Sequence, residues 1–309
     1  MGTPPRELAT ARTATVTLLV HHAQYPAHGE GTFSSRVVDG ISRALRADGY
    51  DLLYAPVDDR SVRHLVRLGS VRRGRTDGII VLGPAFPRAA LRVLRDGGQP
   101  MILIDNRLDG VDAVLADNRP AMRRMAEHLV DDHGYRRLTC LAGPPGWPST
   151  AERVAGVRDA LVGRDVLLDV RHARETTIRD GATLATGLAD DPPDAVVAVN
   201  DAMAIGALHR MRSSHREAIP ITGFDDIAWS RLSDPPLTTV AVDALAIGAQ
   251  AATMLLARMS ESDPSRQRAR EFRVPATLQL RRSCGCGSEP SDPSPGRAAA
   301  EAHTPIGST

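Results

Sequence analysis

The sequence contains no lysine, few aromatic residues and no long apolar segment. All 38 basic residues are arginine, which we attribute to the codon usage of a GC-rich genome rather than to a special role for guanidinium groups. Aromatic residues make up 3% of the chain, so a core must be built from alanine, valine, leucine and isoleucine. No stretch approaches the roughly 20 apolar residues of a membrane-spanning helix. The first apolar run, Val16–Val20, is too short for a signal peptide, so we expect a cytoplasmic protein.

Cysteine is also scarce, and this argues against disulfides and metal. The chain has three cysteines, an odd number that does not suit a disulfide framework. Cys284 and Cys286 form the only close pair, and two thiols do not supply the four ligands of a structural zinc site. The loop His21–Gly31 holds three histidines at irregular spacing and is expected to be a solvated loop, so no metal or other cofactor is predicted.

Motifs of common enzyme classes are missing as well. The sequence has no G-x-S-x-G, Walker A, HExxH or G-x-G-x-x-G pattern, so we do not expect an enzyme. A formal net charge of +1 favours neither nucleic acid nor an anionic membrane as a partner of the chain as a whole. A length of 309 residues suits about two domains.

Apolar strands alternate with helical patterns along most of the chain. The predicted strands are 14–20, 52–55, 78–82, 101–104, 138–142, 166–170, 195–199 and 219–223. The predicted helices are 33–48, 61–73, 87–96, 119–131, 151–161, 178–188 and 202–211. Continuous apolar strands separated by helices indicate parallel sheets that are covered on both faces. The sequence therefore predicts an α/β protein with two doubly wound parallel-sheet lobes.

Polar residues follow several of these strands, at the sheet edge where such folds bind ligands. Asp105-Asn106-Arg107 follows one strand, and Ser149, Thr150 and Arg153 follow another. Asn200-Asp201 and Asp225-Asp226 stand after two later strands. A cleft between the lobes would bring carboxylates and a guanidinium around a small polar molecule.

Seven segments in register resemble the LacI/GalR family of bacterial transcription regulators, over about residues 7–283. They are TDGIIVLGP (76–84), QPMILID (99–105), LADNRPAMRRMAEHLVDDHGYRRLTCLAGP (115–144), ERVAGVRDAL (152–161), AVVAVNDAMAIGAL (195–208), ITGFDDI (221–227) and PPLTTVAVD (235–243). The resemblance implies a type I periplasmic binding protein-like fold with a hinge of three crossings. One lobe would comprise about residues 14–116 plus 242–267, and the other 117–241 plus 268–281. It also implies an effector-sensing core that binds a small polar metabolite, with a sugar as the first expectation, to control transcription.

By this resemblance Asp105, Arg153, Asn200 and Asp225 match positions that contact the effector. Each residue also has a structural alternative. Asp105 would cap backbone amides in its turn, Arg153 would be a surface arginine, and Asn200 would cap the next helix while still facing the cleft. Asp225 and its neighbour Asp226 would serve turn chemistry, and no histidine or glutamate cluster accompanies them to suggest catalysis.

Two aromatic residues are further candidates for ligand contact. Trp147 would form a stacking wall for a ring, although its proline-flanked loop favours packing nearly as strongly. Phe86 follows the strand 78–82 and is a weaker candidate. The apolar pair Ala241-Val242 departs from the family, where many members carry a polar residue two positions before the aspartate that matches Asp243.

The ends of the sequence carry separate expectations. Residues 1–13 resemble the tail of a hinge helix, in which Leu8 matches the leucine that wedges into the DNA minor groove. A helix-turn-helix head is not found ahead of it, so these 309 residues alone are not expected to bind operator DNA specifically. The resemblance implies a homodimer. The alternative is a stand-alone cytoplasmic solute-binding or sensor protein without DNA-binding activity. Many family members end their final strand with Arg-x-Ser-Cys, so the resemblance implies that Cys284 and Cys286 are a feature of this terminus, with redox chemistry as the alternative. Residues 287–309 are expected to be a disordered tail.

Overall fold

The structure is a computed structural model of the whole chain. It describes residues 13–21, 32–58, 65, 68, 71, 74–212, 219–261 and 268–287. The proposed DNA wedge Leu8, most of the histidine-containing loop, most of the predicted helix 61–73 and the predicted tail lie outside the described residues. Within the described residues, no helix is long and apolar enough to cross a membrane.

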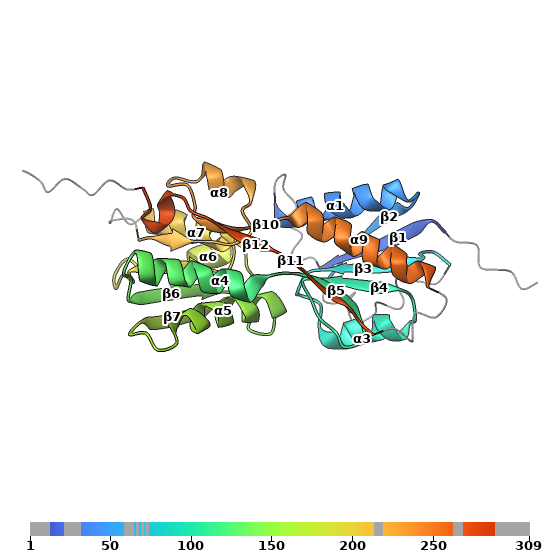
Figure 1. Cartoon of the computed structure of the whole chain (residues 1–309), viewed down its shortest axis with the longest axis horizontal. Coiled ribbons are helices and arrows are strands. Elements are labelled where there is room, and N and C mark those ends of the chain that lie inside the picture. The colour runs from blue at the N-terminus through green and yellow to red at the C-terminus, as the bar shows by residue number, and fades with distance from the viewer. Residues whose placement is uncertain are drawn as a thin grey trace, which may run out of the picture.

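The N-terminal lobe is a parallel sheet between helices (Figure 1). Its strands are β1 (Thr15–His21), β2 (Asp51–Val57), β3 (Gly78–Leu82), β4 (Met101–Ile104), β5 (Asp112–Ala116) and β11 (Glu271–Val274), in the order β11-β5-β4-β3-β1-β2. Helices α1 (Phe33–Ala47) and α9 (Ala244–Ser260) cover one face, and α3 (Arg88–Asp96) covers the other. Successive residues of β1 enter different core clusters, Leu18 with the α1 and α9 side chains and Leu19 with those of α3, as the alternation of a strand requires.

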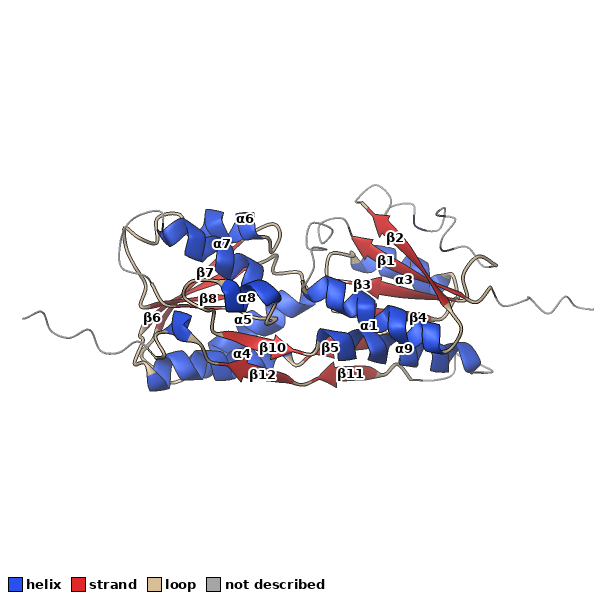
Figure 2. Ribbon diagram, turned by 90° about the horizontal axis from the view of Figure 1, so that it is seen from above, coloured by secondary structure: helices blue, strands red, loops and turns tan. Residues whose placement is uncertain are grey.

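The C-terminal lobe repeats this plan (Figure 2). Its parallel strands are β7 (Leu167–His172), β6 (Arg137–Ala142), β8 (Ala195–Ala198) and β9 (Ile221–Thr222), in the order β7-β6-β8-β9. The antiparallel pair β10 (Thr239–Val242) and β12 (Ala276–Gln279) continues the sheet through a bridge between Thr222 and Thr238. Helices α4 (Asn118–Glu127), η4 (His128–Asp132) and α5 (Pro148–Leu161) lie on one face, and α6 (Ile178–Leu184) and α7 (Asp201–Arg212) on the other. Two short helices, α8 (Ala228–Leu232) and η6 (Arg282–Cys284), complete the lobe. The predicted fold class is confirmed.

The chain crosses between the lobes three times, at Asp117, Asp243 and Pro275. The third crossing corrects the predicted boundary, which assigned residues 268–281 to the C-terminal lobe. Strand β11 pairs in parallel with β5 and so belongs to the N-terminal sheet, and only β12 onward lies in the other lobe. The break falls at Pro275, which has no N–H to donate to a sheet ladder.

Other differences from the predicted elements have local causes. Strands β2 and β7 lie at sheet edges, so their residues alternate in exposure instead of being buried throughout. Strand β5 begins with the buried Asp112, whose carboxylate is paired with Arg258. The apolar pattern did not predict this strand because its first residue is charged. The predicted helix 119–131 divides into α4 and the π-helical turn η4, a distortion that often occurs at functional sites.

Glycines allow α1 and α9 to approach closely. A Cβ atom added to Gly248 would lie 2.0 Å from the carbonyl oxygen of Val37, and one added to Gly40 would lie 2.2 Å from that of Leu245.

We predict that Gly248→Leu lowers the free energy of unfolding by about 1–3 kcal/mol, because the helices must separate. Leucine has the higher helix propensity, so the loss would report crowding alone. Urea denaturation is the measurement, with Thr253→Leu on the exposed face of α9 as the control. Equal midpoints for the two variants would contradict the close packing.

Candidate interlobe ligand site

The loop after β4 presents Asp105 from the N-terminal lobe. Its backbone is held in the left-handed region, with φ of 57°, a conformation that is uncommon outside glycine. The next residue stabilises the loop: the Asn106 side-chain amide donates to the carbonyl oxygens of Gly83 and Phe86 at 3.1 and 3.2 Å. Unusual backbone conformations of this kind gather at functional sites because the surrounding structure must enforce them.

The start of α5 supplies the opposite side. Pro148 occupies the first turn, where its missing N–H costs nothing. The Ser149 hydroxyl donates to an Asp105 carboxylate oxygen at 3.1 Å, so a hydrogen bond joins the two lobes at this point. Arg153 follows one turn later on the same helix.

Arg153 is buried, with 8% of its surface exposed, which is contrary to the alternative of a surface arginine. Its Nε donates to the Asn118 side-chain oxygen at 2.8 Å, and Nη1 donates to the carbonyl of Val199 at 2.7 Å. Its Nη2 lies 3.4 Å from a carboxylate oxygen of Asp225, and its Cζ lies 3.7 Å from the ring centroid of Phe224. The guanidinium is therefore fixed in position by groups from several segments of the C-terminal lobe.

The two neighbouring aspartates after β9 have different roles. Asp225 has a positive φ of 108° and faces Arg153. Asp226 instead forms ion pairs with Arg231 and Arg281, which is a structural role. The buried Asp201, at the start of α7, holds this loop by accepting the backbone N–H of Ile227 at 3.0 Å.

Burial shifts the two facing carboxyl groups toward protonation. It raises the pKa of Asp105 to about 6, although Arg153 opposes the rise. Burial likewise raises the pKa of Asp225 to about 7, again against Arg153, while the neighbouring charge of Asp105 adds to the increase. The two aspartates are thus close enough to affect each other across the lobes, with the guanidinium of Arg153 beside both. We name Asp105, Ser149, Arg153 and Asp225 the interlobe site.

Glu152 joins the lobes beside this site, and sequence reasoning did not single it out. Its carboxylate accepts from Arg107 at 2.6 Å, from Arg273 at 2.9 Å and from the Asn118 amide at 3.2 Å. Burial by itself would raise the pKa of Glu152. The hydrogen bonds and charges of Arg273 and Arg107 outweigh burial and hold this pKa below its usual value. The matched segment 152–161 contains Glu152, but nothing in a single sequence indicates that residues 107 and 273 would meet it.

The other predicted contacts lie nearby in different environments. Asn200 caps α7 by accepting the N–H of Met203 at 2.9 Å, and its amide donates to the carbonyl of Thr176 at 3.0 Å. Trp147 is partly exposed and precedes α5 directly. Phe86 is 3% exposed and packs edge-on against His21, in the core of the N-terminal lobe. Ligand contact by these three residues remains a prediction.

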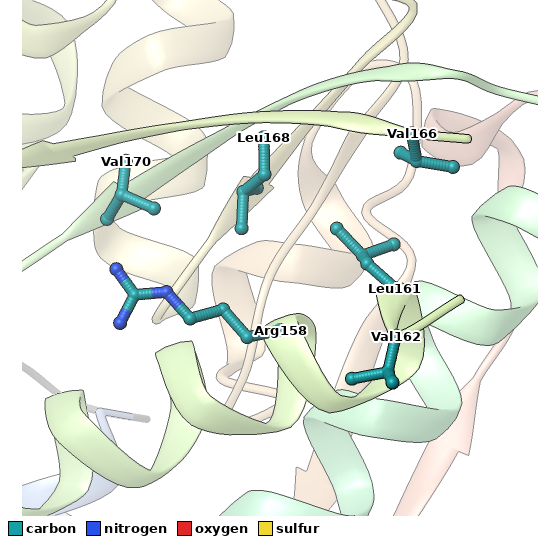
Figure 3. A pocket seen from close by; sticks show the side chains of 6 residues that line it. All are labelled: Arg158, Leu161, Val162, Val166, Leu168 and Val170. Carbon is teal, nitrogen blue, oxygen red and sulfur yellow. The ribbon is translucent and has the colours of Figure 1, made fainter. Parts of the chain in front are cut away.

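A separate pocket lies away from the interlobe site. Figure 3 shows it between the C-terminal half of α5 and β7, lined by Leu161, Val162, Val166, Leu168, Val170 and the side chain of Arg158. Its lining is mostly apolar and Arg158 supplies the one charged side chain, so it offers few of the polar groups that orient a small polar ligand.

Comparison with known proteins agrees with this architecture. The profile of the periplasmic binding protein-like domain matches residues 126–284, just over half of the chain. The chain belongs to the LacI/GalR family, as a periplasmic binding protein-like core. Its homologues are named as transcription regulators, and the chain corresponds to the effector-sensing core of such regulators.

The matched relatives have low sequence identity to the chain but match it over most of its length. The core is 29% identical to the ribose operon repressor of Bacillus subtilis over 230 residues, covering 72% of this chain and 69% of the relative. It is 29% identical to the regulator CelR of Thermobifida fusca over 267 residues, covering 82% and 77%. Among solved structures, a CelR–cellobiose complex matches with a TM-score of 0.77 and 25% identity, covering 88% of this chain and 85% of that one.

The raised pKa values predict how stability depends on pH. A carboxyl group whose pKa is higher in the folded state stabilises the fold below about pH 4, and this stabilisation is lost as the pH rises through the folded-state value. Relative to Asp225→Asn, the wild type should therefore lose stability between pH 5 and 7, by at most about 1.4 kcal/mol per pH unit. Urea unfolding at several pH values measures the difference.

The matched control for this series is Asp159→Asn. Asp159 is paired with Arg119, which lowers its pKa, so it stays ionised across the same range. Its stability difference from the wild type should not change between pH 5 and 7. A pH-independent difference for Asp225→Asn would show that Asp225 is already ionised at pH 5.

Proposed function

We propose that the interlobe site binds a small, neutral, polyhydroxylated metabolite, and that a sugar is the effector this core senses. The observation that carries the proposal is the meeting of Asp105, Arg153 and Asp225, with a serine hydroxyl, where the two lobes join. Carboxylates accept hydrogen bonds from hydroxyl groups, and a guanidinium donates to hydroxyl or ring oxygens. A ligand with several hydroxyls satisfies both kinds of group at once.

The charge of the site favours a neutral ligand. One guanidinium faces two carboxyl groups whose pKa values are about 6 and 7, so the site has no excess of positive charge at neutral pH. A phosphorylated sugar would place further negative charge beside buried carboxylates, which is costly at low effective dielectric. Two relatives have names that fit a neutral sugar, a ribose operon repressor and a CelR–cellobiose complex, whereas a similar structure, the Cra regulator of Pseudomonas putida, is a complex with fructose 1-phosphate. The preference for a neutral ligand therefore rests on the charge of the site and not on these names.

Closure of the lobes would link binding to regulation. Ser149 and Glu152 already contact Asp105 and Arg107 of the other lobe, and a ligand held between Asp105 and Arg153 would favour this arrangement. A ligand shifts such an equilibrium only through its different affinity for the two states. Contacts that exist only when the lobes meet supply that difference, and the lobe orientation would then set the spacing of DNA-binding segments.

The alternative is a stand-alone sensor that does not bind DNA. An in-frame helix-turn-helix encoded upstream of Met1 would favour the regulator, and a nearby stop codon would favour the sensor. Both alternatives use the same interlobe site for binding, and the relatives are regulators rather than enzymes.

Ligand-dependent stabilisation tests the binding site. A panel of pentoses, hexoses, their phosphate esters, disaccharides, polyols and nucleobases should contain a neutral compound that raises the melting temperature, since a ligand at 100 times its Kd adds about 2.7 kcal/mol. Arg153→Met should abolish this rise. It should also lower the free energy of unfolding by about 1–3 kcal/mol, because it leaves buried acceptors unpartnered.

Arg158→Met is the matched control, because Arg158 lies on the same helix but is exposed beside β7 (Figure 3). It should respond to ligand as the wild type does. An unchanged ligand response in folded Arg153→Met would contradict the assignment of the site. Stabilisation by phosphorylated sugars alone would contradict its neutral-ligand preference.

We further propose that the core is a homodimer. Regulators that read paired half-sites present two heads, and a two-fold dimer places them symmetrically. Sedimentation velocity at micromolar concentration should give the mass of two chains, with and without ligand. A monomer under these conditions would favour the stand-alone sensor.

A further inference from the structure

Two histidines and two cysteines from distant parts of the chain converge at one point of the C-terminal lobe. His128 begins the π-helical turn η4 and His133 follows it, while Cys284 ends η6 and Cys286 lies two residues later. The two Nε2 atoms are 3.2 Å apart. The Sγ of Cys286 lies 3.5 Å from Nε2 of His128 and 3.4 Å from that of His133, and the Sγ of Cys284 lies 3.6 Å from Nε2 of His128.

These four of the six distances between the ligand atoms are close to the edge lengths of a metal coordination tetrahedron. Zinc–nitrogen bonds of about 2.0–2.1 Å and zinc–sulfur bonds of about 2.3 Å place neighbouring ligand atoms about 3.3–3.8 Å apart. All four ligand atoms of the cluster lie within 4.8 Å of one another. The sequence by itself offers only two neighbouring thiols, but the fold supplies two imidazoles as the remaining ligands.

Neighbouring groups orient the ligands as they do around bound zinc. Nδ1 of His128 lies 2.7 Å from a carboxylate oxygen of Asp132. A carboxylate there favours a proton on Nδ1 and leaves the lone pair of Nε2 directed at the cluster. The Thr238 hydroxyl lies 3.0 Å from the Sγ of Cys284 and 2.9 Å from the carbonyl oxygen of Arg281, so it contacts the loop that carries this thiol. His133 stacks on the ring of Tyr135, with centroids 5.2 Å apart.

The backbone at η4 and at the turn between the two cysteines allows the four side chains to come close together. The switch from α4 to the π-helical η4 carries His128 to the cluster and keeps it buried. Gly285, between the two cysteines, has a positive φ of 101°, and a Cβ atom there would lie 2.9 Å from the hydroxyl of Tyr135. That hydroxyl donates to the carbonyl of Cys284 at 3.0 Å. The tight turn thus allows both thiols to face the same point.

We propose that His128, His133, Cys284 and Cys286 form a zinc site of the His2Cys2 type. With four protein ligands the coordination is complete, so the site is structural rather than catalytic. The metal would connect η6, which follows β12 after the third crossing, to η4, which continues α4 after the first crossing. Figure 1 shows η6 at the outer end of the C-terminal lobe, away from the interlobe site, so the metal stabilises this lobe independently of the effector.

The experiment uses the full, untagged chain. After gel filtration, elemental analysis should find about one zinc ion per chain, as a closed site with four protein ligands requires. Cobalt(II) added to the metal-depleted protein should give the visible absorption of tetrahedral cobalt and a thiolate charge-transfer band in the near ultraviolet. Chelation should lower the melting temperature by several degrees, because the metal binds only the folded chain.

Variants at the two partly exposed ligands separate this site from chance binding. Cys286→Ser and His133→Gln should lose stoichiometric zinc and the cobalt spectrum, and chelation should no longer change their melting temperature. Cys140→Ala is the matched control, since it removes the third thiol, on β6, and should keep both. Circular dichroism and ligand-dependent stabilisation, where a ligand is found, establish that the variants fold.

Three results would overturn the proposal. One is a wild-type protein that takes up neither zinc nor cobalt at micromolar metal. The second is equal metal content in the wild type and folded Cys286→Ser, which would indicate adventitious binding only. The third is a mass two hydrogens below that of the reduced chain under mild conditions, together with no metal, which would assign Cys284 and Cys286 to a disulfide.

Discussion

The buried guanidinium of Arg153 is the constraint on which the ligand-binding end of the C-terminal lobe depends. A buried charge is tolerated only when it is hydrogen-bonded and paired. Arg153 meets this requirement with Asn118 at the start of α4, the carbonyl of Val199 after β8 and the carboxylate of Asp225 after β9. The segments that follow β5, β8 and β9 are thereby held around one side chain. The same guanidinium also interacts electrostatically with Asp105 of the other lobe.

The aspartates that face this guanidinium are held in costly states. Asp105 and Asp225 combine a positive φ with a raised pKa, so both backbone conformation and burial act against them. Asp201 and Asp226 do not face Arg153, yet they hold the loop that carries Asp225. A ligand at the proposed site would donate hydroxyl hydrogen bonds to these two buried carboxyl groups, which water reaches poorly.

Residues 268–287 contact both lobes. Strand β11 extends the N-terminal sheet, and Glu271 at its start pairs with Arg107 beside the interlobe site. After Pro275, β12 pairs with β10, and Arg281 binds Asp226 in the ligand loop. The chain then reaches the proposed zinc site at Cys284 and Cys286. A metal there would fix the far end of a segment whose near end, β11, lies beside the proposed interlobe site, so the two proposed sites lie along one stretch of backbone.

Local pattern alone determined most strands, the helices between them and the polar residues that follow β4, β6, β8 and β9, because apolar periodicity and strand ends are properties of short segments. Those residues included Asp105, Arg153 and Asp225. Tertiary structure decided the rest. It placed β11 in the N-terminal sheet, buried Arg153, paired Asp226 with two arginines and brought Glu152 to Arg107. The cluster of His128 and His133 with Cys284 and Cys286 is the clearest case. About 150 residues separate its halves in the chain, and only the packing of η6 against η4 brings a pair of thiols to a pair of imidazoles.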